Sequence, residues 1–178
     1  MKLKSQIMNE EDINRTLIRL AHQILEKNSG ADELCLIGIK TRGVPLALRI
    51  AENIEKIEHV KVETGVLDIT LYRDDLSRIN PDPVVSQSHV PFSIEDKIVV
   101  LVDDVIFTGR TARAALDALM SLGRPKKVQL VELIDRGHSE LPIKANYVGK
   151  NIPTSLNEVV AVQLQETDGV NSVVIYEL

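Results

Sequence analysis

The stretch VVLVDDVIFTGRT, residues 99–111, constrains the fold more than any other part of the chain. An apolar run from Ile98 to Val102 leads directly into two acids, Asp103 and Asp104. An unbroken apolar run of this kind is typical of a strand buried on both faces of a parallel sheet. Because open α/β sheets place ligands at the carboxyl ends of their strands, we expect the two acids to lie at a binding site.

The residues after the acid pair predict a phosphate site. Thr108-Gly109-Arg110-Thr111 forms a short loop, and a helix is expected over residues 110–122. Backbone N–H groups and the positive end of a helix dipole suit a phosphate dianion. Two adjacent carboxylates repel each other, and ribose hydroxyls or a divalent metal would relieve that repulsion. The alternative is a buried strand that ends in an acidic turn without a ligand.

The alternation of strands and helices along the chain indicates an α/β fold with a mostly parallel, doubly wound sheet in one domain, residues 1–178. Helices are expected over about 10–28, 44–57 and 110–122, and strands over 34–40, 60–71, 97–104, 127–134, 159–164 and 173–176. The segments 72–93 and 135–157 show no periodicity. A stretch as long as the first is usually a lid, a binding loop or disordered.

Charge, aromatic content and cysteine content limit which partners and which cellular compartment the protein can have. The net charge is −5, so a nucleic-acid site would have to be a local patch. Aromatic residues make up only 3% of the chain and Trp is absent, which argues against a base-stacking platform. Cys35 is the single cysteine, which excludes an internal disulfide and favours a reducing, cytoplasmic setting. The sequence has neither a signal-peptide pattern nor an apolar run of membrane-spanning length, so no membrane partner is expected.

The stretch 99–111 resembles the 5-phosphoribosyl-1-pyrophosphate (PRPP) signature of type I phosphoribosyltransferases. The resemblance implies that family's single-domain fold, with a flexible loop at about 72–93 and a hood over the base at about 135–157. It also implies that Asp103 and Asp104 hold the ribose hydroxyls of PRPP, directly or through Mg²⁺ as cofactor. The residues that the resemblance places at PRPP or the nucleotide are Thr41, Arg42, Arg73, Asp103, Asp104, Val105, Ile106, Phe107, Thr108, Gly109, Arg110, Thr111, Arg136 and Val160.

A second segment, Lys40-Thr41-Arg42-Gly43, resembles the pyrophosphate loop of this family, which often contains a cis non-proline peptide bond. Arg42 would bind the leaving group and would be catalytic together with Asp103 and Asp104. The implied reaction is displacement of pyrophosphate from the anomeric carbon by a base nitrogen. No general base can be assigned, although Asp104 lies nearest by analogy. In the flexible loop Arg73 is the first candidate to reach the pyrophosphate and Arg78 the second, with a solvated loop as the alternative.

Nearly the whole chain resembles one branch of the family, the PyrR-type regulators of pyrimidine operons, which are also uracil phosphoribosyltransferases. The shared motifs are IGIKTRG, DITLYRDDL, and the hood pattern DRGH…LPI…YVGKNIPTS. The resemblance implies an enzyme that makes UMP from uracil and PRPP. It also implies a homodimer or higher homo-oligomer that binds pyrimidine-operon leader RNA when UMP is bound, and so promotes attenuation of transcription. A phosphoribosyltransferase for a purine or orotate, sharing only the PRPP half, is the alternative.

The hood and the first helix supply the remaining candidates. Arg136 and the strand start near Val160 are placed at the nucleotide, with a salt bridge from Arg136 to Asp135 or Glu140 as the alternative. The basic residues that the resemblance assigns to RNA are Arg15, Arg19 and His22 on the first helix and His138, Lys144 and Lys150 in the hood. A solvated helix face is the alternative, and Glu26 on that face favours it. The family often has a hydroxyl residue at position 18 and an arginine at 139, where this chain has Ile18 and Ser139. The loss of one charge and one hydroxyl donor is expected to weaken or retune RNA binding, and it bears on the regulatory role more than on the enzymatic one.

Overall fold

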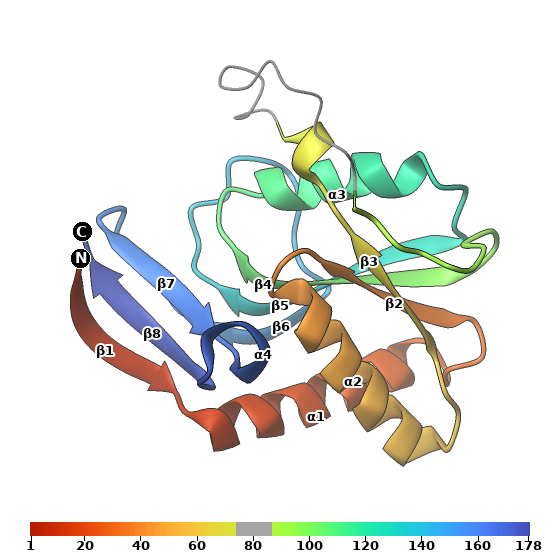
Figure 1. Cartoon of the computed structure of the whole chain (residues 1–178), viewed down its shortest axis with the longest axis horizontal. Helices are drawn as coiled ribbons and strands as arrows, with labels where there is room; N and C mark the ends of the chain where they lie inside the picture. The colour runs from red at the N-terminus through yellow and green to blue at the C-terminus, as the bar shows by residue number, and fades with distance from the viewer. Residues whose placement is uncertain (74–86) are drawn as a thin grey trace.

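Within residues 1–73 and 87–178, which the computed structural model describes, the main body is a five-stranded parallel sheet (Figure 1). Its strands in spatial order are β3 (Glu63–Leu67), β2 (Leu34–Ile39), β4 (Ile98–Ile106), β5 (Lys127–Asp135) and β6 (Tyr147–Asn151). Every neighbouring pair is parallel. The central strands β2 and β4 are almost wholly apolar because both of their faces are covered.

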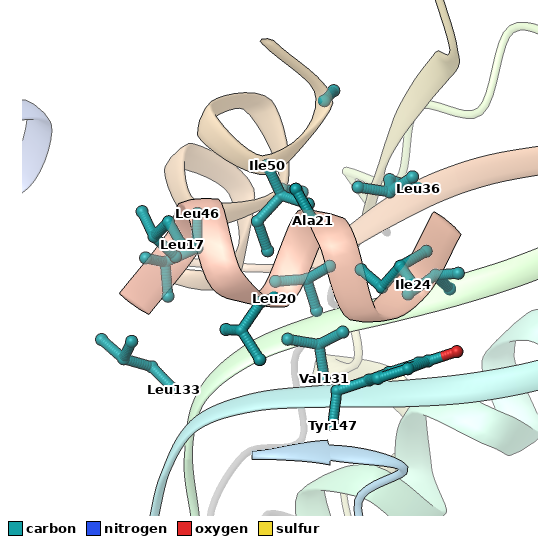
Figure 2. Close-up of a cluster of buried hydrophobic side chains, with 14 of the residues drawn as sticks. Leu17, Leu20, Ala21, Ile24, Leu36, Leu46, Ile50, Val131, Leu133 and Tyr147 are labelled. Carbon is teal, nitrogen blue, oxygen red and sulfur yellow. The ribbon is translucent and has the colours of Figure 1, made fainter. Parts of the chain in front are cut away.

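Helices cover both faces of this sheet, which confirms the doubly wound prediction. Two of them, α1 (Glu10–Lys27) and α2 (Gly43–Glu58), lie on one face, and α3 (Arg110–Met120) lies on the other (Figure 1). Side chains from α1 and α2 interlock with those of β2, β5 and β6 in the larger core (Figure 2). The smaller core joins α3 to the opposite face. Burial of these apolar stripes fixes how the helices approach the strands that carry the site.

The first helix begins where the sequence predicts. The side chain of Asn9 accepts a hydrogen bond from the N–H of Asp12 at 2.9 Å, and the Asp12 carboxylate accepts one from the N–H of Asn9 at 3.1 Å. This reciprocal capping box satisfies two backbone donors that the first turn would otherwise leave without partners. At the other end, the Asn28 amide donates to the carbonyl of Ile24 at 2.9 Å.

A three-stranded antiparallel sheet lies beside the main body, at the left of Figure 1. Its strands in spatial order are β1 (Lys2–Met8), β8 (Ser172–Glu177) and β7 (Glu158–Gln163). Pairing of β1 with β8 brings the two chain termini together. A four-residue helix, α4 (Gln165–Asp168), connects β7 to β8.

Three sequence-based expectations about elements need correction. The strand expected over 60–71 is shorter, because the chain turns after Leu67 into a 3-10 helix, η1 (Thr70–Tyr72). The segment 135–157 is not irregular throughout, since β6 pairs with β5 at the edge of the main sheet. Neither β1 nor α4 was expected. Residues 74–86 of the expected flexible loop lie outside the described residues. None of the helices in the described ranges is both long and apolar enough to span a membrane.

Candidate phosphoribosyl site

The carboxyl ends of β2, β3 and β4 meet at one cavity of about 540 Å³. The chain leaves β2 toward β3 on one side and returns to β4 on the other, so the cavity lies where the winding of the sheet reverses, the usual ligand position in such folds. The residues that line it are Lys40, Thr41, Arg42, Asp68, Ile69, Thr70, Arg73, Gln87, Asp103, Asp104, Val105 and Thr111. The cavity therefore brings together residues from three segments that the sequence singled out.

The acid pair occupies the end of β4. The side chain of Asp103 is almost fully buried, and its carboxylate accepts a hydrogen bond from the N–H of Asp104 at 2.9 Å. Asp104 in turn accepts from the N–H of Val105 at 3.0 Å. Burial, and then the charge of Asp104, raise the pKa of Asp103 well above its usual range. Burial also raises the pKa of Asp104, against the opposing effect of its hydrogen bonds and of Arg42. A cation or hydroxyl donors in the cavity would stabilise both carboxylates.

The loop 40–43 is held tightly against the sheet. The peptide bond between Lys40 and Thr41 is cis. A Cβ atom on Gly43 would lie 2.2 Å from the carbonyl oxygen of Val102, and one on Gly38 would lie 2.5 Å from the oxygen of Gly43. Because only glycine fits at both positions, the loop can approach β4 closely and present its backbone to the cavity.

Arg42 has a partner that the sequence analysis missed. Its Nε and one terminal nitrogen donate to the two carboxylate oxygens of Asp168, at 3.2 and 2.7 Å. This bidentate contact raises the pKa of Arg42 and lowers that of Asp168. The two residues are 126 positions apart, so no local pattern could have linked them.

The loop before α3 turns at a glycine with a left-handed backbone conformation. Gly109 adopts φ +92° at the N-cap of α3, a value that L side chains rarely reach. The hydroxyl of Thr108 accepts from the N–H of Arg110 at 3.4 Å, and the Arg110 guanidinium contacts the carboxylate of Glu140 at 3.0 Å. The N–H of Glu140 donates to the carbonyl of Thr108 at 2.9 Å, so the hood segment packs directly beside this loop.

Asp68, at the end of β3, is a second residue that the sequence analysis missed. Its carboxylate accepts from the N–H and the hydroxyl of Thr70, at 3.0 and 2.6 Å, and from the N–H of Gln87 at 3.2 Å. These contacts join the two described ends of the loop segment and lower the pKa of Asp68. An acid inside the strand predicted over 60–71 was the signal that could have identified it, because a charged residue there suggests that the strand ends earlier. Arg73 lines the same cavity, whereas Arg78 lies outside the described residues.

Comparison with known proteins decides the family. The sequence pattern described as the phosphoribosyl transferase domain matches residues 4–167. The Bifunctional protein PyrR of Clostridium kluyveri is 60% identical over 178 residues, covering all of both chains. That of Deinococcus radiodurans is 55% identical over 174 residues, covering 98% of this chain and 95% of the relative. The chain belongs to the PyrR family of phosphoribosyltransferases.

Solved structures confirm the phosphoribosyltransferase fold. A hypoxanthine phosphoribosyltransferase of Staphylococcus aureus superimposes with a TM-score of 0.74 at 23% identity, over 97% of this chain and 92% of that one. One from Trypanosoma cruzi gives 0.77 at 20% identity, over 98% and 96%. At these sequence identities the structural similarity supports the fold and not a particular substrate.

Half of the residues expected at PRPP or the nucleotide of this phosphoribosyltransferase do not line the Asp103 cavity, namely Ile106, Phe107, Thr108, Gly109, Arg110, Arg136 and Val160. Ile106 and Val160 are buried in the two cores. The Arg136 guanidinium stacks 4.0 Å from the ring of Phe107. It donates to the hydroxyl of Thr154 and to the carbonyl oxygens of Ser155 and Glu158, at 3.0, 3.2 and 2.8 Å. Arg136 thus ties the end of β5 to the segment 154–158, and these partners include neither a residue of the Asp103 cavity nor Asp135 or Glu140, the alternative salt-bridge partners.

The residues expected to contact RNA fall into two groups. Arg15, Arg19 and His22 are exposed on α1, and the Arg19 guanidinium donates to the carbonyl oxygens of Val148 and Gly149 in β6. Lys150, also in β6, reaches the carbonyl of Ile7 at 3.5 Å. We call these four residues the α1/β6 basic surface.

The other two RNA candidates lie elsewhere in this phosphoribosyltransferase. The ring of His138 bonds the carbonyl of Thr154 at 2.6 Å and packs edge-on against Phe107. Lys144 lines a small cavity beside α3, on the opposite face of the main sheet from α1. The departures at 18 and 139 also differ in setting: Ile18 is exposed on α1, and the Ser139 hydroxyl donates to the carbonyl of Leu141 at 2.8 Å.

Proposed function

We propose that this protein is a uracil phosphoribosyltransferase that converts uracil and PRPP to UMP and pyrophosphate. We further propose that, with UMP bound, it binds the leader of pyrimidine-operon mRNA and promotes transcriptional attenuation. The observation that carries the enzymatic proposal is a cavity lined together by the acid pair, residues 40–42 and Thr111 in the first turn of α3. Full-length identity to proteins named Bifunctional protein PyrR supports both roles.

In the proposed reaction the protein positions the substrates more than it reacts with them. The loop 108–111 holds the 5′-phosphate with backbone N–H groups and threonine hydroxyls. Asp103 and Asp104 hold the ribose hydroxyls, which fixes the anomeric carbon between the two loops. Arg42 and the loop 40–43 bind the pyrophosphate as its charge grows, and an approaching base nitrogen completes the displacement.

Magnesium fits the donors that the cavity offers. Among the described residues there is no group of three or more His, Cys, Asp or Glu side chains able to hold a metal alone. Mg²⁺ commonly binds through one or two carboxylates together with substrate phosphates and water, and Asp103 and Asp104 supply such a pair. When bound, the ion would neutralise charge on the departing pyrophosphate. Removal of Mg²⁺ with EDTA is expected to abolish turnover, and its return to restore it.

The setting and assembly follow from the same proposal. We place the protein in the cytoplasm, where its PRPP and RNA partners occur, and the buried thiol of Cys35 needs no oxidising compartment. We expect a homodimer or a higher homo-oligomer, with RNA bound across a surface between subunits. Light scattering coupled to size-exclusion chromatography measures the assembly, and a monomer at micromolar concentration would contradict it.

Substrate choice is the direct test of the enzymatic proposal. Pyrophosphate release from PRPP should be rapid with uracil and slow with guanine, hypoxanthine or orotate. The double variant Asp103→Asn/Asp104→Asn should lose UMP synthesis by several orders of magnitude, because ribose and Mg²⁺ lose both carboxylates. Turnover of a purine without turnover of uracil would reject uracil as the substrate.

RNA binding is tested separately by gel shift with the leader of a pyrimidine operon, with and without UMP. UMP should strengthen binding to the leader and leave a scrambled hairpin weakly bound. RNA binding by the double variant should persist wherever its UMP binding persists. Equal binding to both RNAs would reject specific regulation.

A further inference from the structure

The connection between β7 and β8 is fastened to helix α2 by two parallel ion pairs. Arg42, just before α2, makes the bidentate contact with Asp168 described above. Two turns further along, Arg49 donates to both carboxylate oxygens of Glu166 at 2.9 and 2.6 Å, and to the Asn171 side chain at 2.8 Å. Both acids belong to α4, so this short helix contacts one arginine at the N-cap of α2 and one within α2. Only Arg42 lines the cavity.

The carboxylate of Asp168 is itself fixed in place. The oxygen that accepts from Arg42 Nε also accepts from the N–H of Leu164 at 2.9 Å and from the hydroxyl of Thr167 at 2.7 Å. The side chain of Asp168 is 20% exposed, whereas that of Arg42 is 38% exposed. A guanidinium has five N–H donors, and Asp168 engages two of them. Donors therefore remain for an anion in the cavity while the side chain is held from behind.

We infer that Asp168 is a positioning residue for the phosphoribosyltransferase reaction, holding Arg42 in the orientation that binds the pyrophosphate of PRPP. The inference rests on the proposed function of the cavity. A long arginine side chain loses rotamer freedom when it binds a ligand, and a contact that restrains it beforehand reduces that cost. Through this pair the antiparallel sheet supports a loop of the catalytic cavity, although β7 and β8 contribute no residue to its lining.

The pair Arg49–Glu166 offers a matched control, because it fastens the same connection to the same helix outside the cavity. Asp168→Asn should raise the KM for PRPP and weaken inhibition by pyrophosphate, each about fivefold to tenfold. Its affinity for UMP, which carries no pyrophosphate, should stay within about twofold of the wild type. Glu166→Gln should leave all three quantities unchanged. If the two ion pairs served only to hold α4 against α2, Asp168→Asn and Glu166→Gln would change these three quantities in the same way.

A double-mutant cycle tests whether Asp168 acts through Arg42. In an Arg42→Gln background, Asp168→Asn should change the KM for PRPP by no more than about twofold, because the group it positions is gone. Thr167→Ala, which removes one donor to the Asp168 carboxylate, should give a smaller rise in the same KM. This milder variant keeps the test open if Asp168→Asn fails to fold.

Four results would overturn the inference. They are a full effect of Asp168→Asn in the Arg42→Gln background, an equal loss of UMP affinity, identical behaviour of Asp168→Asn and Glu166→Gln, and a lower KM for PRPP in Asp168→Asn. The last result would mean that Asp168 competes with pyrophosphate for Arg42. Failure of the proposed function looks different, since the wild type itself would not turn over uracil. Calorimetric binding of PRPP and pyrophosphate would still compare the variants in that case.

Discussion

At the residue scale, Glu132 is a buried acid whose carboxyl group lacks a full set of hydrogen bonds within the described part of the chain. It lies in β5 directly opposite Asp103 of β4 and is almost completely buried. Among the described residues, its Oε2 atom has no hydrogen-bond partner. Burial, and then the charge of Asp103, raise the pKa of Glu132 well above its usual range. A buried carboxyl without full hydrogen bonding lowers the stability of the folded state.

Replacement of Glu132 by methionine should therefore stabilise the protein. We expect Glu132→Met to raise the free energy of unfolding by about 1–3 kcal/mol at neutral pH. Because the pKa of Glu132 is higher in the folded than in the unfolded state, the wild type loses stability as the pH rises above the ordinary value of 4.5. The gain from the substitution should therefore be larger at pH 7.5 than at pH 4.5. Urea unfolding in EDTA measures the free energy of unfolding of the wild type and the variant at the two pH values. A variant that is less stable than the wild type at pH 7.5 would contradict the prediction.

Single residues also show how far the sequence could predict the site. The acid pair and the loop 108–111 form one contiguous pattern, so Asp103, Asp104, Val105 and Thr111 were placed at the cavity from the sequence. Asp168 could not be found this way, because its contact with Arg42 depends on how the second sheet docks.

At the element scale, short edge strands escaped prediction because their sequences carry little hydrophobic pattern. The strand β6 reads YVGKN, with two exposed residues at its end. Gly149 in its middle lies so close to β5 that a Cβ atom would be 2.4 Å from the carbonyl oxygen of Leu133. Strand β1 is mostly exposed and forms by pairing with β8. Tertiary pairing decides such elements, whereas the buried strands β2, β4 and β5 were predicted from their own residues.

The capping box of α1 should contribute measurably to stability. Asn9→Ala removes the side chain that accepts from Asp12 N–H, and we expect it to lower the free energy of unfolding by about 1 kcal/mol. Asn14→Ala, at an exposed position within the same helix, should be neutral or slightly stabilising because alanine is the better helix former. Chemical denaturation compares the two, and equal effects would argue against the cap. Uracil turnover should not change in either variant, since α1 contributes no residue to the cavity.

Arg136 should be more sensitive to substitution than an exposed arginine. Its guanidinium is buried and holds the segment 154–158 to the end of β5 through Thr154, Ser155 and Glu158. Lysine keeps the charge but loses the planar fork, so Arg136→Lys should lower the free energy of unfolding by about 2 kcal/mol or more. Arg113→Lys, in an exposed pair with Asp117, should stay within about 0.5 kcal/mol of the wild type. A similar loss in the two variants would mean that the Arg136 contacts stabilise little.

At the scale of the whole molecule, polar contacts join parts of the chain that are far apart in sequence. Arg19 reaches β6 across 130 positions, and Arg42 reaches Asp168 across 126. The first contact helps to build the α1/β6 basic surface and the second supports the cavity. Because the net charge is −5, we expect any attraction to RNA to come from a local basic surface such as this one, against a repulsive background.

The salt dependence of leader binding tests this surface. Arg15 is exposed and paired with Glu11, and exposed pairs of this kind are weak enough to exchange for a phosphate. Arg15→Gln should weaken binding and reduce the slope of log affinity against log salt by about one. Glu11→Gln should strengthen RNA binding, because the carboxylate that competes with phosphate for Arg15 is gone. Arg113→Gln, on the opposite face of the main sheet, should leave both the affinity and the slope unchanged. If Arg113→Gln weakened binding as much as Arg15→Gln, the attraction would come from overall charge and the RNA site would not lie on α1 and β6.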